Sequence, residues 1–255
     1  MQRTLDNRAI IVTGAGGGIG RAASLIFAQA GARVVVSDVD VANGEETVNQ
    51  IAAQGGTAMF VKTDIANEAS VAALVEQTVA AYGKLDGAFN NAGIAPSHKA
   101  FHDISRAEWQ RVIDVDLTGA FLCMKHEIAA MLQSGGGSIV NTASALGVVA
   151  VPSAGDYIAA KHGVIGLTKA AAVDYGIRNI RVNAVLPGLI MTPLVKEALR
   201  DPEYASHFEK YKAQHLVGRV GLPEEVARTA EWLLSDAASF VTGHSMGVDG
   251  GWTTV

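Results

Sequence analysis

The sequence has a single cysteine and no long apolar run. Because Cys123 stands alone among 255 residues, no intramolecular disulfide can form, which fits a reducing compartment. No uncharged apolar run reaches the ~18 residues that indicate a membrane span. Residues 1–8 are polar and hold no apolar segment of the signal-peptide type. These absences predict a cytoplasmic protein without membrane association.

The sequence also lacks a strong excess of either positive or negative charge. The chain has 20 Lys and Arg against 25 Asp and Glu, a net charge of -5, and its basic residues form no run. Nucleic acid and anionic lipid are therefore not expected as partners. No metal site is expected either, because His98 and His102 lie in a segment without clear helical character and without acidic or cysteine partners. The composition, 49% hydrophobic and 18% charged, is typical of a globular chain.

Short apolar runs alternate with longer amphipathic segments along the chain. Strands are expected at Ala9–Thr13, Arg33–Asp38, Thr57–Lys62, Leu85–Asn90, Ser138–Thr142, Ile180–Leu186 and Ser245–Val248. Helices are expected at Ile19–Ala30, Val71–Tyr82, Glu108–Leu132 and Tyr157–Tyr175. Near-continuous apolar strands are typical of a parallel sheet that is covered on both faces. We therefore predict an α/β fold, a doubly wound Rossmann-type sheet, in one domain over residues 1–255.

Glycine and proline residues at the ends of the expected helices support this prediction. Gly31 and Gly83 each follow an expected helix, at the position where a left-handed residue ends it. Pro223 opens a further helical segment. The stretch from about 188 to 221 is more polar and less regular than the rest. We expect it to be an insertion that forms a flap or a small helical lid beside the substrate.

A glycine-rich turn follows the first expected strand. The run Thr13-Gly14-Ala15-Gly16-Gly17-Gly18-Ile19-Gly20 opens the first expected helix. Glycines permit a tight strand-to-helix turn and let the backbone approach a pyrophosphate at the helix N-terminus. A flexible glycine loop is the alternative, but the flanking strand and helix favour a dinucleotide site.

Asp38 ends the second expected strand, 24 positions after Gly14. A carboxylate there accepts hydrogen bonds from the adenosine ribose and repels a 2′-phosphate. Neither the glycine turn nor Val39, which follows Asp38, supplies a basic side chain. These residues favour NAD over NADP as the cofactor, and the alternative is a solvated strand-end carboxylate.

Tyr157 and Lys161 are four positions apart on an expected helix and so share a face. A neighbouring ammonium favours the phenolate form of a tyrosine, which suits it for proton transfer. Ser144 follows the expected strand Ser138–Thr142, at the edge where open α/β sheets bind ligands. Its hydroxyl is placed to donate to a carbonyl oxygen that gains negative charge during hydride addition. Alone, a tyrosine and a lysine at this spacing indicate only helix packing.

Taken together, these motifs identify a family resemblance. The chain resembles the short-chain dehydrogenase/reductase family over essentially its full length. The matching motifs are Thr13-Gly14-x-x-x-Gly18-x-Gly20, Asn90-Asn91-Ala92-Gly93, Ser144, Tyr157-x-x-x-Lys161, Pro187-Gly188 with Thr192, and the tail from Thr242 to Gly251. The runs Asp86–Asn91 and Ser138–Ser144 are similar to those of bacterial cyclic-diol and secondary-alcohol dehydrogenases.

The resemblance implies roles for individual residues. Tyr157 is expected as the acid/base, Ser144 as the group that polarises the substrate oxygen, and Lys161 as the group that tunes Tyr157 and binds the nicotinamide ribose. The implied cofactor site comprises Gly14, Gly18, Ile19, Gly20, Asp38, Asp64, Ile65, Asn91, Ala92, Gly93, Tyr157, Lys161, Pro187, Gly188, Ile190 and Thr192. A homotetramer is also implied.

Asp116 departs from the family pattern, in which an asparagine is usual at this position. That residue helps to hold a water that links the lysine to solvent. A carboxylate adds a charge that stabilises the ammonium form of Lys161. We expect Asp116 to belong to the catalytic set with a changed pH profile, and a purely structural role is the alternative.

The substrate is the least determined feature. The residues expected to wall the site, Ala145–Val151 and the segment from 188 to 221, are largely apolar and offer no obvious arginine for an anionic group. A small neutral secondary alcohol, diol or ketone is therefore expected. Reduction of a 3-oxoacyl thioester is the second enzymatic interpretation. A binding module that senses NAD(H) without turnover is the non-enzymatic one, and the presence of the tyrosine, lysine and serine disfavours it.

Overall fold

A computed structural model describes residues 4–200 and 202–254 of the chain. Within these residues it forms one seven-stranded, wholly parallel sheet in the order β3-β2-β1-β4-β5-β6-β7. The strands are β1 (Ala9–Thr13), β2 (Arg33–Asp38), β3 (Thr57–Lys62), β4 (Gly87–Asn90), β5 (Gly137–Thr142), β6 (Ile180–Pro187) and β7 (Ser245–Val248). The predicted fold class, a doubly wound α/β sheet in a single domain, is confirmed.

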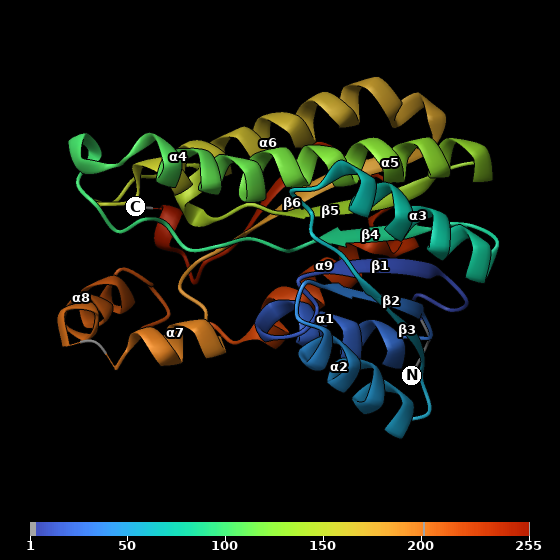
Figure 1. The fold of residues 1–255 in the computed structure, drawn as a ribbon, viewed down its shortest axis with the longest axis horizontal. Coiled ribbons are helices and arrows are strands. Elements are labelled where there is room, and N and C mark those ends of the chain that lie inside the picture. Colours follow the sequence, from blue (N-terminus) through green and yellow to red (C-terminus); the bar gives the residue numbers. More distant parts are fainter. Residues whose placement is uncertain (1–3, 201, 255) are drawn as a thin grey trace.

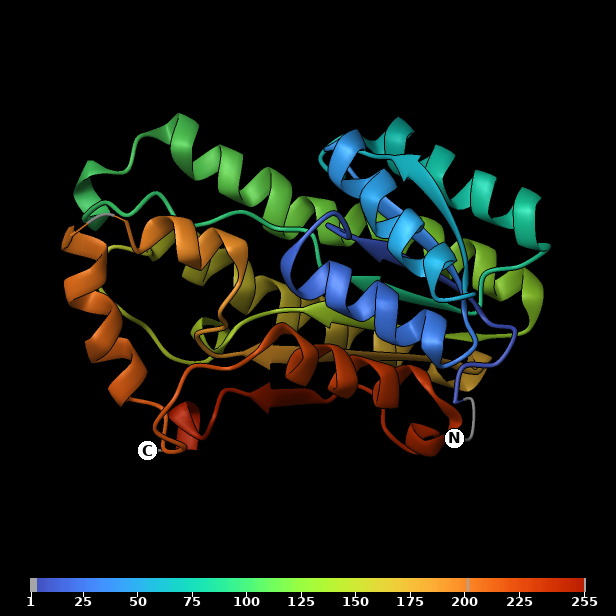
Figure 2. The same ribbon diagram turned by 90° about the horizontal axis from the view of Figure 1, so that it is seen from below.

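Helices cover both faces of the sheet (Figures 1 and 2). The main helices are α1 (Gly18–Gln29), α2 (Val41–Ala53), α3 (Glu68–Tyr82), α4 (Arg106–Ile113), α5 (Gly119–Ser134), α6 (Gly155–Tyr175), α7 (Pro193–Ala198), α8 (Pro202–Ala213) and α9 (Pro223–Leu234). In Figure 1, α3 to α6 lie above the sheet, whereas α1, α2 and α9 lie below it. Among the described residues, none of these helices is long and apolar enough to cross a membrane.

Each face of the sheet buries its own apolar core. On one face, α1 and α9 pack over the strands, and Phe27 meets Phe89 edge to face with ring centroids 6.0 Å apart. On the other face, α3, α5 and α6 cover a second core that includes Leu74, Met131 and Ile139. Because both faces are covered, the central strands β1, β4, β5 and β6 are buried along almost their whole length rather than at alternate residues.

The segment predicted as one helix over Glu108–Leu132 is not one continuous α-helix. α4 ends at Ile113, a π-helical turn covers Asp114–Thr118, and α5 begins at Gly119. A π-helical turn inserts one extra residue and often lies at a functional site. Here it carries the buried Asp116.

Other predicted boundaries differ by one to three residues. β4 begins at Gly87 rather than at Leu85, although the Asp86 backbone still bonds to both sides: its amide donates to the Ala9 carbonyl at 3.0 Å and its carbonyl accepts from the Ser138 amide at 3.1 Å. Gly31 and Gly83 adopt the predicted left-handed conformation, with φ of 95° and 80°. Pro223 opens α9 as predicted.

The sheet topology determines where a ligand site is expected. The strand order reverses between β1 and β4, and such a switch point opens a crevice at the carboxyl ends of the strands. The strands in Figure 1 point toward the end of the molecule where α7 and α8 lie. The segment from 188 to 221, predicted as a flap, contains these two helices and follows β6.

Candidate active site

The glycine turn packs too closely for side chains. Gly14 has φ of 63°, and a Cβ on it would lie 2.9 Å from the Ala92 Cα atom. A Cβ on Gly20 would overlap the Gly14 carbonyl. The turn is thus pressed against the segment that follows β4, and both positions require glycine.

The N-terminus of α1 is left without a side-chain cap. Its N-cap residue, Gly17, supplies no hydrogen bond, and the first turn contains no acidic residue. The amides of Gly18, Ile19 and Gly20 therefore have no partner within the helix. A Cβ on Gly17 would meet nothing within 4 Å, so the space before the helix is open. Unpartnered amides at a positive helix end suit a phosphate group.

Asp38 lies beside this turn, as its position at the end of β2 predicted. One of its carboxylate oxygens accepts a hydrogen bond from the Gly16 amide at 2.8 Å, and the other accepts from the Asp40 amide at 3.0 Å. Arg21 braces the same turn from the helix side: its Nε donates to Thr47 Oγ1 at 3.0 Å, and one terminal nitrogen donates to the Gly16 carbonyl. The guanidinium is thereby engaged with the protein itself.

A threonine joins the two strands that flank the switch point. The Thr13 hydroxyl, at the end of β1, accepts hydrogen bonds from the Asn91 amide at 3.0 Å and the Ala92 amide at 3.1 Å. In return, Asn91 Nδ2 donates to the Thr13 carbonyl at 3.1 Å. These bonds fix the Asn91–Gly93 segment against the glycine turn, so the two predicted parts of the cofactor site come together.

Lys161 is the charged centre of a second cluster. It lies on α6, is only 3% exposed, and its Nζ donates to the Thr142 carbonyl at the end of β5 at 3.1 Å. The same Nζ lies 5.3 Å from the centroid of the Tyr157 ring. Ser144 follows β5 and is 8% exposed, and its hydroxyl accepts from the Leu146 amide at 3.1 Å. The helix and the strand end thus bring the predicted catalytic residues to one edge of the sheet.

Asp116 reaches this cluster from the π-helical turn. Its Oδ2 lies 3.4 Å from Lys161 Nζ, and its Oδ1 accepts a hydrogen bond from the Ile94 amide at 2.8 Å. A Cβ on Gly93 would lie 3.3 Å from Asp116 Oδ1 and 3.3 Å from Lys161 Nζ. The carboxylate therefore contacts both the lysine and the loop that follows β4.

Burial and charge act against each other in this pair. Burial raises the pKa of the Asp116 carboxyl above its usual value, although Lys161 and the Ile94 amide oppose that shift. Burial acts to lower the pKa of Lys161, but the charges of Asp116 and Tyr157 outweigh it and raise that pKa. Lys161 is therefore held in its ammonium form by the Asp116 carboxylate.

The chain after β6 closes the other side of the site. Thr192 is the N-cap of α7, and a Cβ on Gly18 would lie 3.3 Å from its methyl carbon. Ile190 is 6% exposed and pairs with Gly221 in an isolated parallel bridge. Pro187 ends β6, and Gly188 donates its amide hydrogen to the Val248 carbonyl at 3.1 Å.

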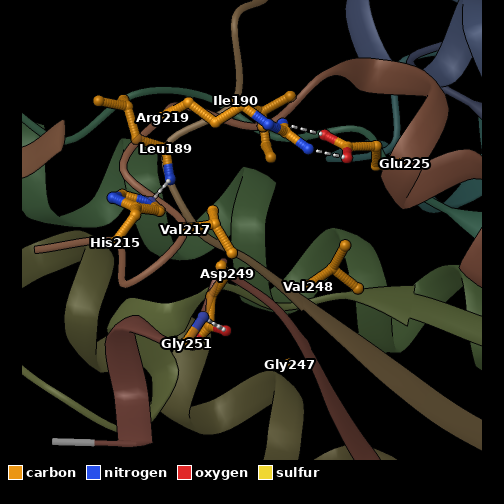
Figure 3. A pocket seen from close by; sticks show the side chains of 12 residues that line it. Leu189, Ile190, His215, Val217, Arg219, Glu225, Gly247, Val248, Asp249 and Gly251 are labelled. Carbon is orange, nitrogen blue, oxygen red and sulfur yellow. Dashed lines mark hydrogen bonds and ion pairs between the residues drawn. The ribbon is translucent and has the colours of Figure 1, made fainter.

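A cavity of about 310 Å³ adjoins this segment (Figure 3). Its polar lining is already paired, because His215 Nε2 accepts from the Leu189 amide at 3.0 Å and Arg219 forms an ion pair with Glu225 at 2.6 Å. Asp249 accepts from the Gly251 amide at 3.0 Å. None of Ser144, Tyr157 and Lys161 lines this cavity, which therefore lies apart from the proton-transfer cluster.

Two predicted cofactor residues, Asp64 and Ile65, lie just after β3. Asp64 follows β3 and is exposed, and its Oδ1 accepts from the Ala66 amide at 3.0 Å. Ile65 is 7% exposed and packs so closely on α5 that a Cβ on Gly119 would lie 2.8 Å from its Cδ1. The carboxylate is therefore accessible, whereas the isoleucine side chain is part of the packing.

Comparison with known proteins decides the family. The sequence family described as enoyl-(acyl carrier protein) reductase matches residues 14–253. The chain is 49% identical over 253 residues to a 2,5-dichloro-2,5-cyclohexadiene-1,4-diol dehydrogenase of Sphingobium indicum, covering 98% of this chain and 99% of the relative. It is 44% identical to a cyclohexanol dehydrogenase of an Acinetobacter species, covering 100% and 98%. The crystal structure of levodione reductase superposes with a TM-score of 0.94 at 34% identity, covering 98% of this chain and 99% of that one.

The chain belongs to the short-chain dehydrogenase/reductase family. Membership confirms the resemblance derived from the sequence, and it makes the protein an oxidoreductase with a nicotinamide dinucleotide, NAD or NADP, as its cofactor. The residues fit such a group. The uncapped α1 N-terminus offers amides to the pyrophosphate, and the glycine turn leaves space in front of them.

Three residues of this short-chain dehydrogenase/reductase were not found from the sequence as parts of the site. Arg21 braces the glycine turn, and its place three positions after Gly18 was the only available signal. Glu127 on α5 is 1% exposed and accepts a hydrogen bond from Asn90 Nδ2 at 2.9 Å. Asp156 is fully buried beside Tyr157. Neither acidic residue lies in a motif, and only its contacts show its position.

Proposed function

We propose that this enzyme is an NAD-dependent dehydrogenase of small neutral cyclic secondary alcohols or diols, working reversibly with the corresponding ketones. The observation that carries the proposal is the buried Lys161 ammonium, held between the Asp116 carboxylate and the Thr142 carbonyl and facing the Tyr157 ring. A fixed cation beside a phenol favours the phenolate, and a phenolate is the base that removal of an alcohol proton requires.

Each residue of the cluster has one task in this proposal. During oxidation, Tyr157 Oη accepts the proton of the substrate hydroxyl, and during reduction it returns a proton to the carbonyl oxygen. The Ser144 hydroxyl donates a hydrogen bond to the same oxygen and so holds it in place. Lys161 stabilises the phenolate, and Asp116 keeps Lys161 protonated. The bound nicotinamide supplies the hydride chemistry.

NAD is the proposed cofactor. The Asp38 carboxylate lies against the glycine turn through its bond to the Gly16 amide, where its charge disfavours a 2′-phosphate. The nearest cation on α1, Arg21, is engaged with Thr47 and the Gly16 carbonyl rather than free to bind a phosphate.

The cyclic substrate is supported by two of the relatives, which are named for cyclohexadienediol and cyclohexanol oxidation. It is supported as well by the largely apolar residues expected to wall the site, among them Leu146, Val148 and Met191. An apolar wall binds the ring carbons, while Ser144 and Tyr157 supply the two polar contacts that one hydroxyl needs.

The second candidate is reduction of a 3-oxoacyl thioester, which the enoyl-reductase description of the matching family favours. An acidic carrier protein needs a basic surface beside the site. In the flap, however, Arg200, Lys212 and Arg219 are each paired with a glutamate. This pairing favours the free alcohol over the carrier-bound thioester.

A substrate panel tests the proposal. The purified protein with NAD should oxidise cyclohexanol and cyclic diols, followed by the absorbance of NADH, and should show little turnover of 3-oxoacyl thioesters. Tyr157→Phe should lower kcat by roughly 10²–10⁴-fold while leaving NADH affinity unchanged, because only the proton acceptor is lost. Binding of NADH without turnover of any panel member would instead support a sensor of the cofactor.

The cofactor preference has a separate test. The parent enzyme should have a higher kcat/KM with NAD than with NADP, and Asp38→Ala should reduce that ratio by removing the charge that repels a 2′-phosphate. A parent enzyme that already prefers NADP would refute the assignment of NAD. The homotetramer and the cytoplasmic location stay predictions, and light scattering after size exclusion tests the former.

A further inference from the structure

The carboxylate of Asp156 joins the catalytic helix to the β4 loop (residues 91–100). Asp156 is the second residue of α6 and is fully buried. One of its oxygens accepts a hydrogen bond from the Tyr157 amide at 2.8 Å, and the other accepts from the Ser97 amide at 3.0 Å. One side chain therefore contacts both the backbone of the proposed acid/base and the loop that passes beside it.

The β4 loop has no regular secondary structure of its own, so its course depends on such contacts. At its start, the Ile94 amide donates to Asp116 Oδ1 at 2.8 Å. Just beyond its end, the ring of Phe101 lies where a Cβ on Gly155 would be only 2.8 Å away. The β4 loop thus runs along the first turn of α6, and the hydrogen bond from the Ser97 amide to Asp156 attaches the middle of the loop to that helix.

The charge of Asp156 explains why this contact is firm. A buried carboxylate is costly unless its oxygens are hydrogen-bonded, and bonds from N–H groups to an ionised acceptor are about twice as strong as neutral ones. Its place in the first turn of α6 adds the favourable field of the helix N-terminus. An asparagine has one acceptor oxygen and therefore satisfies only one of the two amides.

We propose that Asp156 is a positioning residue that fixes the separation of the β4 loop from Tyr157 and thereby sets the ring size that the site accepts. The inference rests on the proposed oxidation of cyclic alcohols. Asp156 accepts hydrogen bonds from the amides of both Tyr157 and Ser97, so a loop released from it can move away from the first turn of α6 and widen the space next to Tyr157. Asp156 does not itself exchange a proton with the substrate.

The test uses Asp156→Asn, with Asp86→Asn as a matched control. Asp86 also accepts a backbone hydrogen bond, from Ala9 at 2.9 Å, but it precedes β4 at the opposite edge of the sheet. For Asp156→Asn we expect KM for cyclohexanol to rise about ten-fold with kcat changed less than three-fold. The ratio of kcat/KM for cycloheptanol to that for cyclohexanol should rise. Asp86→Asn should leave KM and this ratio unchanged, whatever it does to thermal stability.

Hydrogen exchange supplies a readout that does not depend on turnover. Mass spectrometry of peptides that cover the β4 loop should show slow exchange at Ser97 in the parent and at least ten-fold faster exchange in Asp156→Asn. If that variant does not fold, Ser97→Pro removes the donor instead and should produce the same change in KM and ring-size ratio. The proposed function fails if the parent oxidises no cyclic alcohol. The positioning role fails if an active parent and its variants share one ring-size ratio.

Discussion

We predict that the protonation of Glu127 makes the stability of this fold depend on pH. Glu127 is 1% exposed on α5, and burial raises its pKa to about 7 although the hydrogen bond from Asn90 opposes the shift. Asn90 Nδ2 also donates to Asn141 Oδ1 at 3.1 Å, and Asn141 Nδ2 donates to Thr168 Oγ1 at 3.0 Å. The carboxyl thus ends a buried polar chain that links α5, β4, β5 and α6.

The sign and size of the effect follow from proton linkage. Because the folded pKa of about 7 exceeds the model-compound value of 4.5, the native state binds a proton that the unfolded state has released between these values. The free energy of unfolding therefore falls as the pH rises from about 4.5 to about 7, and it is constant above and below that window. Each pH unit corresponds to about 1.4 kcal/mol, so the full loss is on the order of 3 kcal/mol.

Urea denaturation of the parent and of Glu127→Gln between pH 5 and pH 8 tests this. Glutamine keeps an acceptor for Asn90 but cannot ionise, so the variant should gain stability relative to the parent as the pH rises, to about 3 kcal/mol at pH 8. Glu76→Gln, an exposed change on α3, serves as the control. If the difference between Glu127→Gln and the parent is the same at both ends of the range, Glu127 does not titrate there and the reasoning is wrong.

Three further substitutions test other contacts. Asp116→Asn removes the charge that raises the pKa of Lys161, so the alkaline limb of the kcat/KM profile should move to lower pH, and an unmoved limb would show that the carboxylate has no such role. Gly188→Ala places a Cβ 2.6 Å from His215 Nε2 and should destabilise the fold by roughly 1–3 kcal/mol in urea denaturation, as overpacking does. Gly166→Ala on α6, where a Cβ meets nothing within 4 Å, should instead stabilise by up to about 1 kcal/mol, and equal effects of the two glycine changes would contradict the packing argument.

The parts of the fold that sequence reasoning predicted best are those in which local pattern and burial agree. β1, β2, β3 and β7 begin and end at the residues that the sequence predicted. The glycine turn, Ser144, Tyr157 and Lys161 follow from spacing, because each lies at a strand end or on one helix face. In β1 and β2, burial on both faces gives a continuous apolar pattern, which is easily seen in a sequence.

What the sequence did not predict depends on contacts between distant segments. The π-helical turn at Asp114–Thr118 lies between two segments that each have helical spacing, so Glu108–Leu132 resembled one helix. Asp156 and Glu127 are acidic residues of the kind usually found on the exposed face of a helix. In the fold, however, each is buried and accepts a hydrogen bond from a residue far away in the sequence. Their partners, Ser97 and Asn90, are known only once the chain is folded.

The π-helical turn also lets the contact faces of α4 and α5 point in different directions around the helix axis. α4 packs on α6, whereas α5 packs on α3, and one regular helix would have to present a single stripe to both. One extra residue rotates all the following side chains by roughly 100° about the helix axis, compared with an uninterrupted α-helix. Deletion of one residue within this turn would therefore leave a continuous α-helix. Such a helix could pack its apolar face on α3 or on α6, but it would turn a polar face toward the other. The π-helical turn that carries Asp116 next to Lys161 therefore also allows the segment from α4 to α5 to pack on two different helices.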